Sequence, residues 1–157
     1  MGKQIFLMGV FCLMGMGVFA QSADSVKVLA ANRDFAGAQA QSKAYRAIYQ
    51  LDSKDPMIIH KAIRNINNAL NDPRLKGHIQ IELICFAGGT DAVLKSGEYE
   101  KDLRALVLAG VTVAQCANTL RERNIPREQI FDFVGVVPSG NGELIIRQDE
   151  GWAVVKP

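Results

Sequence analysis

Strand-like and helix-like hydrophobic patterns alternate along the chain from residue 44 onward. Short runs rich in apolar residues, several with an apolar residue at every second position, predict strands over residues 45–51, 78–86, 111–115, 131–137 and 152–155. Apolar residues at helical spacing predict helices over residues 56–70, 98–109, 117–123 and 142–150, with short turns over 92–95 and 126–130. This alternation is typical of an α/β protein with a mostly parallel sheet and helices on both faces.

The helix expected after the first strand carries the clearest boundary signals. Asp55 can accept a hydrogen bond at its start, and Pro56 suits its first turn. The triplet Asn71-Asp72-Pro73 is expected to end it. Its apolar stripe, which predicts a buried face, consists of Ile59, Ile63, Ile66 and Leu70.

The first twenty residues have the pattern of a secretory signal peptide. Lys3 precedes an apolar run that extends from residue 5 to residue 19. Val18 and Ala20 satisfy the preference for small residues before a cleavage site. We therefore expect residues 1–20 to be a signal peptide that is cleaved after Ala20.

Two alternatives for this segment are a retained membrane anchor and a lipid attached to Cys12. The apolar run is short for a helix that crosses a bilayer, and Cys12 lies in the middle of the run. The prediction is a protein exported to the periplasm or the extracellular space, with no stable membrane insertion after cleavage.

The rest of the chain divides into an arm and a domain. Residues 21–43 are rich in Ala, Gln, Ser and Asp with weak periodicity, which predicts a tether or a loosely ordered arm. Residues 44–157 are expected to form one α/β domain. Removal of residues 1–20 leaves 17 basic and 16 acidic side chains, and this balance gives no electrostatic case for nucleic-acid binding.

Cys116 lies where the third predicted strand gives way to a helix. A thiol ahead of a helix faces unpaired backbone N–H groups and the positive end of the helix dipole, and both lower its pKa. Thr119, three residues on, shares its helical face and can hydrogen-bond the sulfur. Arg121 and Arg123 can add positive charge. The alternative is that Cys116 is a small buried hydrophobic residue.

The other cysteine and the two histidines favour structural roles. Cys85 shares the face of its strand with isoleucines, which predicts a packed core residue. His60 lies off the apolar stripe of its helix, and His78 has no ligand partner nearby in sequence. Two isolated histidines lack metal-ligand spacing, so the prediction is no metal and no cofactor.

Three loops fall at the carboxyl ends of predicted strands, where ligands gather in open parallel sheets. They contain Gly88-Gly89, Cys116 and Ser139-Gly140. We expect these residues to line one cleft if the strand order brings the loops together. The alternatives are an ordinary turn at the two glycines and a helix cap at Ser139.

Segments spread along residues 45–157 resemble the DsrE/DsrF-like family of sulfur-relay and related proteins. The order and spacing of the matching segments carry this resemblance, and the most informative of them contains Cys116. The segments are YRAIYQL, NINN, IELICFAGG, LAGVTVAQCANTLRERNI, VGVVPSG and RQDEGWAVVKP.

The resemblance implies a three-layer α/β/α domain with a five-stranded parallel sheet, usually assembled as a homotrimer or hexamer. In the sulfur-relay members, the cysteine after the third strand carries sulfur as a persulfide, and Cys116 occupies that position. Asn124 stands where the relay motif commonly has glycine. Relay members act in the cytoplasm, so thiolation of tRNA is not expected for an exported chain.

Two classes of function remain open at this point. The chain is either a thiol-based sulfur carrier or transferase that takes sulfur from a sulfane-sulfur donor on Cys116, or a non-enzymatic oligomeric module that binds a small ligand. In the second case Cys116 is structural. A third hypothesis is a reversible disulfide between Cys85 and Cys116, which requires the two α-carbons to lie within about 7 Å.

Overall fold

The computed structural model describes the backbone of residues 17–157 and the side chains of residues 23–157. The chain divides into two compact units, residues 1–39 and residues 40–157. Most of the predicted signal peptide, residues 1–16, lies outside the described residues, and cleavage after Ala20 stays a prediction. Among the described helices, none is long and apolar enough to cross a bilayer.

The first unit contains one described element, helix α1 (Gly17–Arg33). The predicted arm is therefore helical as far as Arg33 and has no regular structure over residues 35–42. The apolar residues of α1 do not gather along one face, which explains why periodicity gave no helix signal. Val26, Val28 and Leu29 are exposed on it.

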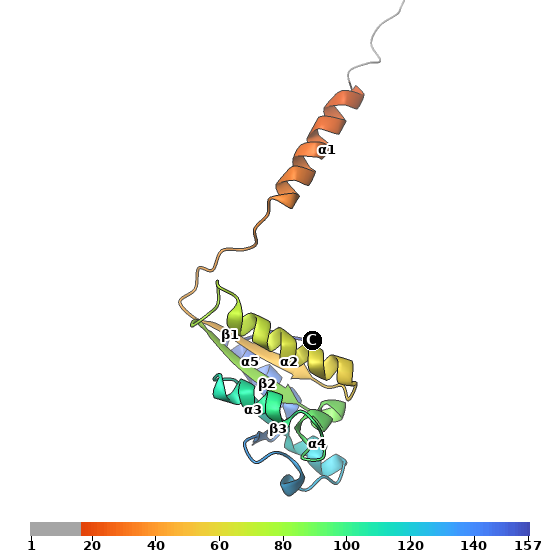
Figure 1. Ribbon diagram of the computed structural model, residues 1–157, viewed down its shortest axis with the longest axis vertical. Coiled ribbons are helices and arrows are strands. Elements are labelled where there is room, and N and C mark those ends of the chain that lie inside the picture. The colour runs from red at the N-terminus through yellow and green to blue at the C-terminus, as the bar shows by residue number, and fades with distance from the viewer. Residues whose placement is uncertain (1–16) are drawn as a thin grey trace, which may run out of the picture. The chain divides into compact units, whose positions relative to one another are not determined.

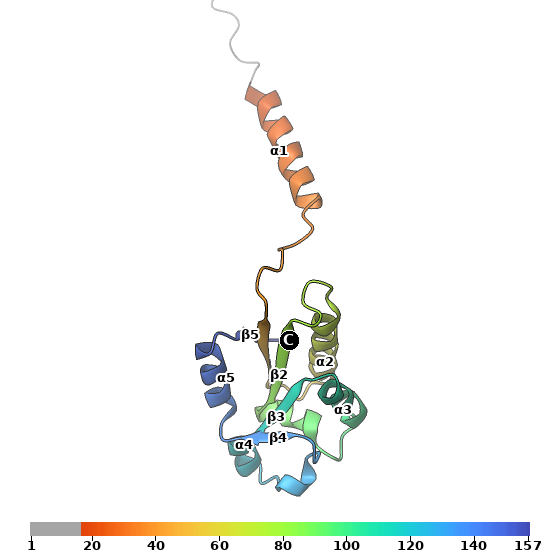
Figure 2. The ribbon, with the colours of Figure 1, turned by 90° about the vertical axis from the view of Figure 1, so that its left-hand side faces the viewer.

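The second unit is a five-stranded, entirely parallel sheet with helices on both faces (Figures 1 and 2). The strand order is β4-β3-β2-β1-β5. The strands are β1 (Tyr45–Leu51), β2 (Ile79–Cys85), β3 (Thr112–Cys116), β4 (Gly135–Val137) and β5 (Ala153–Val155). The predicted α/β fold and the three-layer arrangement are confirmed.

Helices α2 (Pro56–Asn71) and α3 (Glu100–Leu108) lie on one face of the sheet, and α5 (Gly140–Asp149) lies on the other (Figure 2). Helix α2 begins as the sequence predicts, because the Asp55 carboxylate accepts a hydrogen bond from the Met57 N–H at 2.8 Å. Two short elements flank the end of β3: the 3₁₀ helix η1 (Ala87–Val93) and helix α4 (Ala117–Glu122). A second 3₁₀ turn, η2 (Arg127–Gln129), precedes β4.

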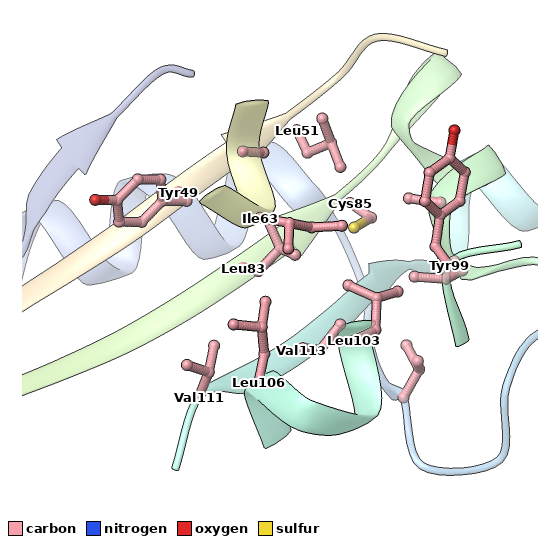
Figure 3. Close-up of a cluster of buried hydrophobic side chains, with 14 of the residues drawn as sticks. Tyr49, Leu51, Ile63, Leu83, Cys85, Tyr99, Leu103, Leu106, Val111 and Val113 are labelled. Carbon is pink, nitrogen blue, oxygen red and sulfur yellow. The ribbon is translucent and has the colours of Figure 1, made fainter. Parts of the chain in front are cut away.

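The two faces of the sheet are filled very differently. Among the described residues, the α2–α3 side holds a core cluster of twenty-one buried residues, which includes Cys85 (Figure 3). The α5 side buries three apolar residues: Ile48, Ile84 and Ala114. The α5 side also buries a charge, because the Glu82 carboxylate is 1% exposed and accepts a hydrogen bond from the Arg147 guanidinium at 2.8 Å.

Several element boundaries differ from the sequence prediction. Strand β4 begins at Gly135 rather than residue 131, because the Arg127 guanidinium binds the carbonyl oxygens of Ile130, Phe131, Asp132 and Val134 and holds that segment in a loop. The turn expected over residues 92–95 is instead the longer η1, which starts at Ala87. Asn124, which stands where the relay motif commonly has glycine, adopts the left-handed conformation that glycine favours, with φ of 51°.

Candidate functional site

Cys116 is the last residue of β3 and the N-cap residue of α4. Its neighbour in register on β4 is Val137. Successive strand residues point to opposite faces, and the residue before it, Gln115, is paired in register with the core residue Cys85. The Cys116 side chain therefore points to the α5 side of the sheet.

Polar groups from two helices converge on the Cys116 thiol. The Cys116 side chain makes no cap hydrogen bond with α4. Burial, the largest single influence, raises the pKa of the thiol. The backbone N–H groups of Thr119, Gly140 and Asn118, together with the Thr119 hydroxyl, outweigh burial and hold the pKa of Cys116 below its ordinary value.

The Thr119 hydroxyl is oriented by a second partner. It accepts a hydrogen bond from the Ala87 N–H at 3.0 Å, which leaves its own proton for donation toward the sulfur. Arg123 binds the same residue, because its guanidinium donates to the Ala87 carbonyl oxygen at 3.0 Å and also pairs with Asp91 at 2.6 Å. Helix α4 thus holds the start of η1 beside the thiol. The hydroxyl of Thr119, the residue predicted to share the helical face of Cys116, is one of the groups that lower the pKa of the thiol.

Gly140 contributes its N–H because it has no side chain. A Cβ at this position would lie 2.9 Å from the aromatic ring of Phe86, so a larger residue would displace the start of α5. The residue before Gly140 is Ser139. It is the N-cap of α5, and its hydroxyl accepts a hydrogen bond from the Gly142 N–H at 3.2 Å.

Gly88 and Gly89 serve close packing instead of surrounding the thiol. A Cβ on Gly89 would overlap the carbonyl oxygen of Leu51, and one on Gly88 would lie 2.7 Å from the backbone nitrogen of Lys54. Both glycines therefore let η1 approach the loop between β1 and α2. Of the residues selected from the sequence, Thr119 and Gly140 act on the Cys116 sulfur. Ser139 caps the helix that begins at Gly140.

A cavity of about 420 Å³ opens at the carboxyl end of the sheet. It lies between the loop after β1 and the segment that joins η1 to α3, and two of its lining residues, Ile59 and Tyr99, belong to the α2–α3 core. The predicted site residues do not line it. Its lining consists of Lys54, Ile59, Asp91, Leu94, Ser96, Gly97, Glu98 and Tyr99.

Cys85 and Cys116 are both free thiols. They lie on adjacent strands one residue out of register, so their backbones are close. Cys85 nevertheless points into the α2–α3 core, and Cys116 points to the opposite face. A disulfide requires the two β-carbons to face each other, so this geometry argues against the reversible disulfide. The prediction that Cys85 is a packed core residue is confirmed.

The histidines do not form a metal site with other ligands in the described part of the chain. His60 and His78 are both exposed, and His60 contacts the Tyr99 ring edge-on with ring centroids 5.3 Å apart. Between residues 17 and 157, no group of three or more histidine, cysteine or acidic side chains is placed to hold a metal ion.

Sequence reasoning missed one residue next to the thiol, Gln115. This side chain is fully buried on the core face of β3, where the alternation of Val111 and Val113 predicts an apolar residue. A polar residue at a position that the strand pattern assigns to the core is a signal that the sequence contained.

The family of the chain follows from comparison with known proteins. The model of the DsrE/DsrF-like family matches residues 27–157. The chain belongs to the DsrE/DsrF-like family. This match confirms the family prediction made from the sequence. The DsrE/DsrF-like family is associated in general with sulfur relay.

Two solved structures resemble this DsrE/DsrF-like protein. One is MTH1491, a protein of unknown function from Methanobacterium thermoautotrophicum, with 32% identity and a TM-score of 0.68 over 72% of this chain and 99% of that chain. The other is BT1422, a conserved protein of unknown function from Bacteroides thetaiotaomicron, with 11% identity and a TM-score of 0.60 over 77% of this chain and 100% of that chain. The second likeness concerns the fold alone. No curated protein matched the sequence.

Proposed function

We propose that this DsrE/DsrF-like protein is a sulfur carrier or transferase that holds sulfur as a persulfide on Cys116. The observation that carries the proposal is the convergence of N–H groups from the starts of α4 and α5, with the Thr119 hydroxyl, on one sulfur atom. These groups favour the thiolate, which is the form of cysteine that attacks other sulfur atoms.

The proposed loading step is a transfer of neutral sulfur with no net oxidation. The Cys116 thiolate attacks the terminal sulfur of a small persulfide, RSSH. A new bond forms between the two sulfurs as the donor's S–S bond breaks. The electron pair of the broken bond leaves with the donor sulfur, which ends as the thiol RSH, and Cys116 ends as the persulfide anion.

The same polar groups also assist unloading. When an acceptor thiolate attacks the outer sulfur of the Cys116 persulfide, the Cys116 sulfur becomes the leaving group. A thiol with a lower pKa leaves faster in such exchanges. The N–H groups of Thr119, Asn118 and Gly140 therefore stabilise Cys116 both as the attacking thiolate and as the departing thiolate.

The limited exposure of Cys116 restricts the donor. The residue is 5% exposed, so we propose that donors and acceptors present sulfur on a slender group, such as a low-molecular-weight persulfide or the extended cysteine of a partner protein. A bulky aromatic disulfide is then expected to react much more slowly with Cys116 than a small methyl thiosulfonate does.

Intact-mass measurement tests the proposal directly. The reduced full chain is incubated with a small persulfide, and the gain of one sulfur atom is located by peptide mapping. We expect wild type and Cys85→Ala to gain sulfur at Cys116, and Cys116→Ser to gain none in the domain. Equal loading of Cys116→Ser, or an unreactive Cys116 in native protein, would favour the competing function as a ligand-binding module.

We also propose that the protein acts outside the cytoplasm after cleavage behind Ala20. The sequence pattern of residues 1–20 supports this proposal. N-terminal sequencing of the protein recovered from each cell fraction of a bacterial expression host checks it. A chain that keeps Lys3 and stays in the cytoplasm contradicts it.

A homotrimer or hexamer completes the proposal. Three large apolar side chains on the α5 side support it, because Ile145, Ile146 and Val154 are 69%, 56% and 40% exposed. Light scattering gives the mass in solution, and Ile145→Asp is expected to shift that mass downward. A monomeric wild-type protein would contradict this part of the proposal.

A further inference from the structure

Gln115 places a polar side chain inside the apolar core of the α2–α3 side. The residue is 0% exposed. Its amide nitrogen donates to the Thr90 hydroxyl at 2.9 Å and to the backbone carbonyl of Cys116 at 3.0 Å. Its amide oxygen, Oε1, is buried without a hydrogen-bond partner among the described residues. The side chain therefore makes two bonds and leaves one acceptor unsatisfied.

The orientation of this amide is fixed by chemistry. The Cys116 carbonyl can only accept a hydrogen bond, so the amide nitrogen has to face it. Reversal of the amide would satisfy Oε1 with the Thr90 hydroxyl, but it would place two oxygens against each other at Cys116. The unsatisfied Oε1 is thus a consequence of holding the Cys116 carbonyl.

The two bonds of Gln115 complete a closed set of links around Cys116. On the carbonyl side, Gln115 ties the end of β3 to Thr90 in η1. On the sulfur side, the Thr119 hydroxyl of α4 accepts a hydrogen bond from the N–H of Ala87, the first residue of η1. The η1 segment is therefore linked by hydrogen bonds both to Gln115, which holds the Cys116 carbonyl, and to Thr119, which acts on the Cys116 thiol.

An apolar side chain of similar length would fill this position without the unsatisfied Oε1, but it would remove the donor that the Thr90 hydroxyl, itself 0% exposed, receives from Gln115. Removal of the buried Oε1 and loss of the bond to Thr90 have opposite effects on the free energy of unfolding. Packing alone therefore gives no reason for glutamine here, and the bonds to Thr90 and to the Cys116 carbonyl are what the residue contributes.

We propose that Gln115 is a positioning residue, whose amide holds the end of β3 and η1 in the arrangement that brings Thr119 and the N–H groups of α4 and α5 to the Cys116 thiol. It does not touch the reacting sulfur. The inference rests on the proposed function for its biological meaning, but the thiol environment that it describes exists without any sulfur donor.

Gln115→Met tests the role, with the Cys116 pKa as the readout. The pKa is measured in the full chain from the pH dependence of iodoacetamide labelling, resolved by peptide mapping so that Cys12 and Cys85 are followed separately. We expect the pKa to rise by about half a unit to one unit, which lowers the thiolate fraction near neutral pH about three- to tenfold. The midpoint of denaturant unfolding is expected to change little, because removal of the unsatisfied Oε1 offsets the loss of the two hydrogen bonds.

Val113→Ala is the matched control, because Val113 lies two residues earlier on the same face of β3 and is equally buried. It should lower the unfolding midpoint and leave the Cys116 pKa unchanged. An unchanged pKa in Gln115→Met, or an equal rise in Val113→Ala, overturns the proposal.

Thr90→Val decides the question if Gln115→Met does not fold. It removes one of the two partners of the Gln115 amide and should raise the Cys116 pKa in the same direction by a smaller amount, whereas no rise overturns the proposal. Because these measurements use no sulfur donor, they stand whether or not Cys116 proves to load sulfur.

Discussion

The two cysteines of the domain lie one residue out of register on adjacent strands, and their pKa values shift in opposite directions. Cys85 is fully buried among apolar side chains, and burial raises the pKa of its thiol to about 12. Cys116 is nearly as buried, yet its pKa lies below the ordinary value. Burial alone therefore does not decide whether a thiol is inert.

What differs is the face of the sheet. The α2–α3 side offers Cys85 hydrocarbon, and desolvation is the cause that acts on its pKa. The α5 side brings the starts of α4 and α5 to Cys116, so that unpaired N–H groups replace water around the sulfur. Labelling rates and the pH dependence of stability measure this contrast, and variants of Gly140 and Thr119 are expected to reduce it.

Labelling rates should show the largest effect. With a small alkylating reagent near neutral pH, native Cys116 is expected to react far faster than Cys85, because burial raises the pKa of Cys85 to about 12 while the pKa of Cys116 lies below its ordinary value. Peptide mapping of a time course gives both rates in one sample. In denaturant the two rates should converge, and a native Cys85 that reacts as fast as Cys116 would contradict the comparison.

Gly140→Ala should disturb the α5 side next most strongly. The added Cβ meets the Phe86 ring, so the start of α5 has to move away, and overpacking of this kind costs about 1–3 kcal/mol of unfolding free energy. We expect the Cys116 pKa to rise as well, because the Gly140 N–H withdraws. Urea unfolding and labelling against pH measure the two effects.

Gly142→Ala is the control in the same turn of α5. Its Cβ would lie 3.3 Å from the Ser139 Cβ, a closeness that a small shift relieves. This variant should therefore leave the Cys116 pKa near the wild-type value. The interpretation of Gly140 is wrong if both variants raise that pKa equally.

Thr119→Val should remove the hydroxyl contribution while keeping the shape of the side chain. The Cys116 sulfur loses a hydrogen-bond donor, and the Ala87 N–H loses its acceptor. We therefore expect the pKa of Cys116 to rise by about one unit. The pH dependence of labelling measures the shift. Thr119→Ser keeps the hydroxyl and should stay close to wild type; a similar rise in both variants would assign the effect to packing.

The pH dependence of stability should have opposite signs for the two thiols, although the effects are small. The folded pKa of Cys116 lies below its unfolded value, so its contribution is present above the unfolded pKa and is lost as pH falls through the folded pKa. The folded pKa of Cys85 lies above its unfolded value, so its contribution is present below the unfolded pKa and is lost as pH rises toward 12.

Unfolding free energies of wild type, Cys116→Ser and Cys85→Ala between pH 7 and pH 10 measure this difference. The gap between wild type and Cys85→Ala should shrink by about 1 kcal/mol by pH 10. The gap between wild type and Cys116→Ser should move toward greater wild-type stability over the same interval. Parallel changes in the two gaps would contradict the contrast.

The fold followed from the sequence because its signals are local. The alternation in β1 and β2, the Asp55 cap and the apolar stripe of α2 each lie within a few residues, and each predicted an element that the structure contains. Strand β4 was predicted too long because Arg127 captures four carbonyl groups of the preceding segment, which no hydrophobic pattern reveals.

The site was only partly predictable for a corresponding reason. Thr119 is three residues from Cys116, so helical spacing predicted their contact. The role of the Gly140 N–H depends on β4 lying beside β3, and strand order does not follow from local patterns. Gly88 and Gly89 were placed at the site because they follow a strand, but their real constraint is the closeness of the loop after β1.

The N–H of Gly140 comes from a segment far along the chain from Cys116, and only the assembled sheet joins them. In an unfolded chain, Cys85 and Cys116 are therefore ordinary thiols of equal standing. As the β4 edge and α5 close over the strand end, the pKa of Cys116 falls and the pKa of Cys85 rises, so the two thiols become different only when the native sheet is complete.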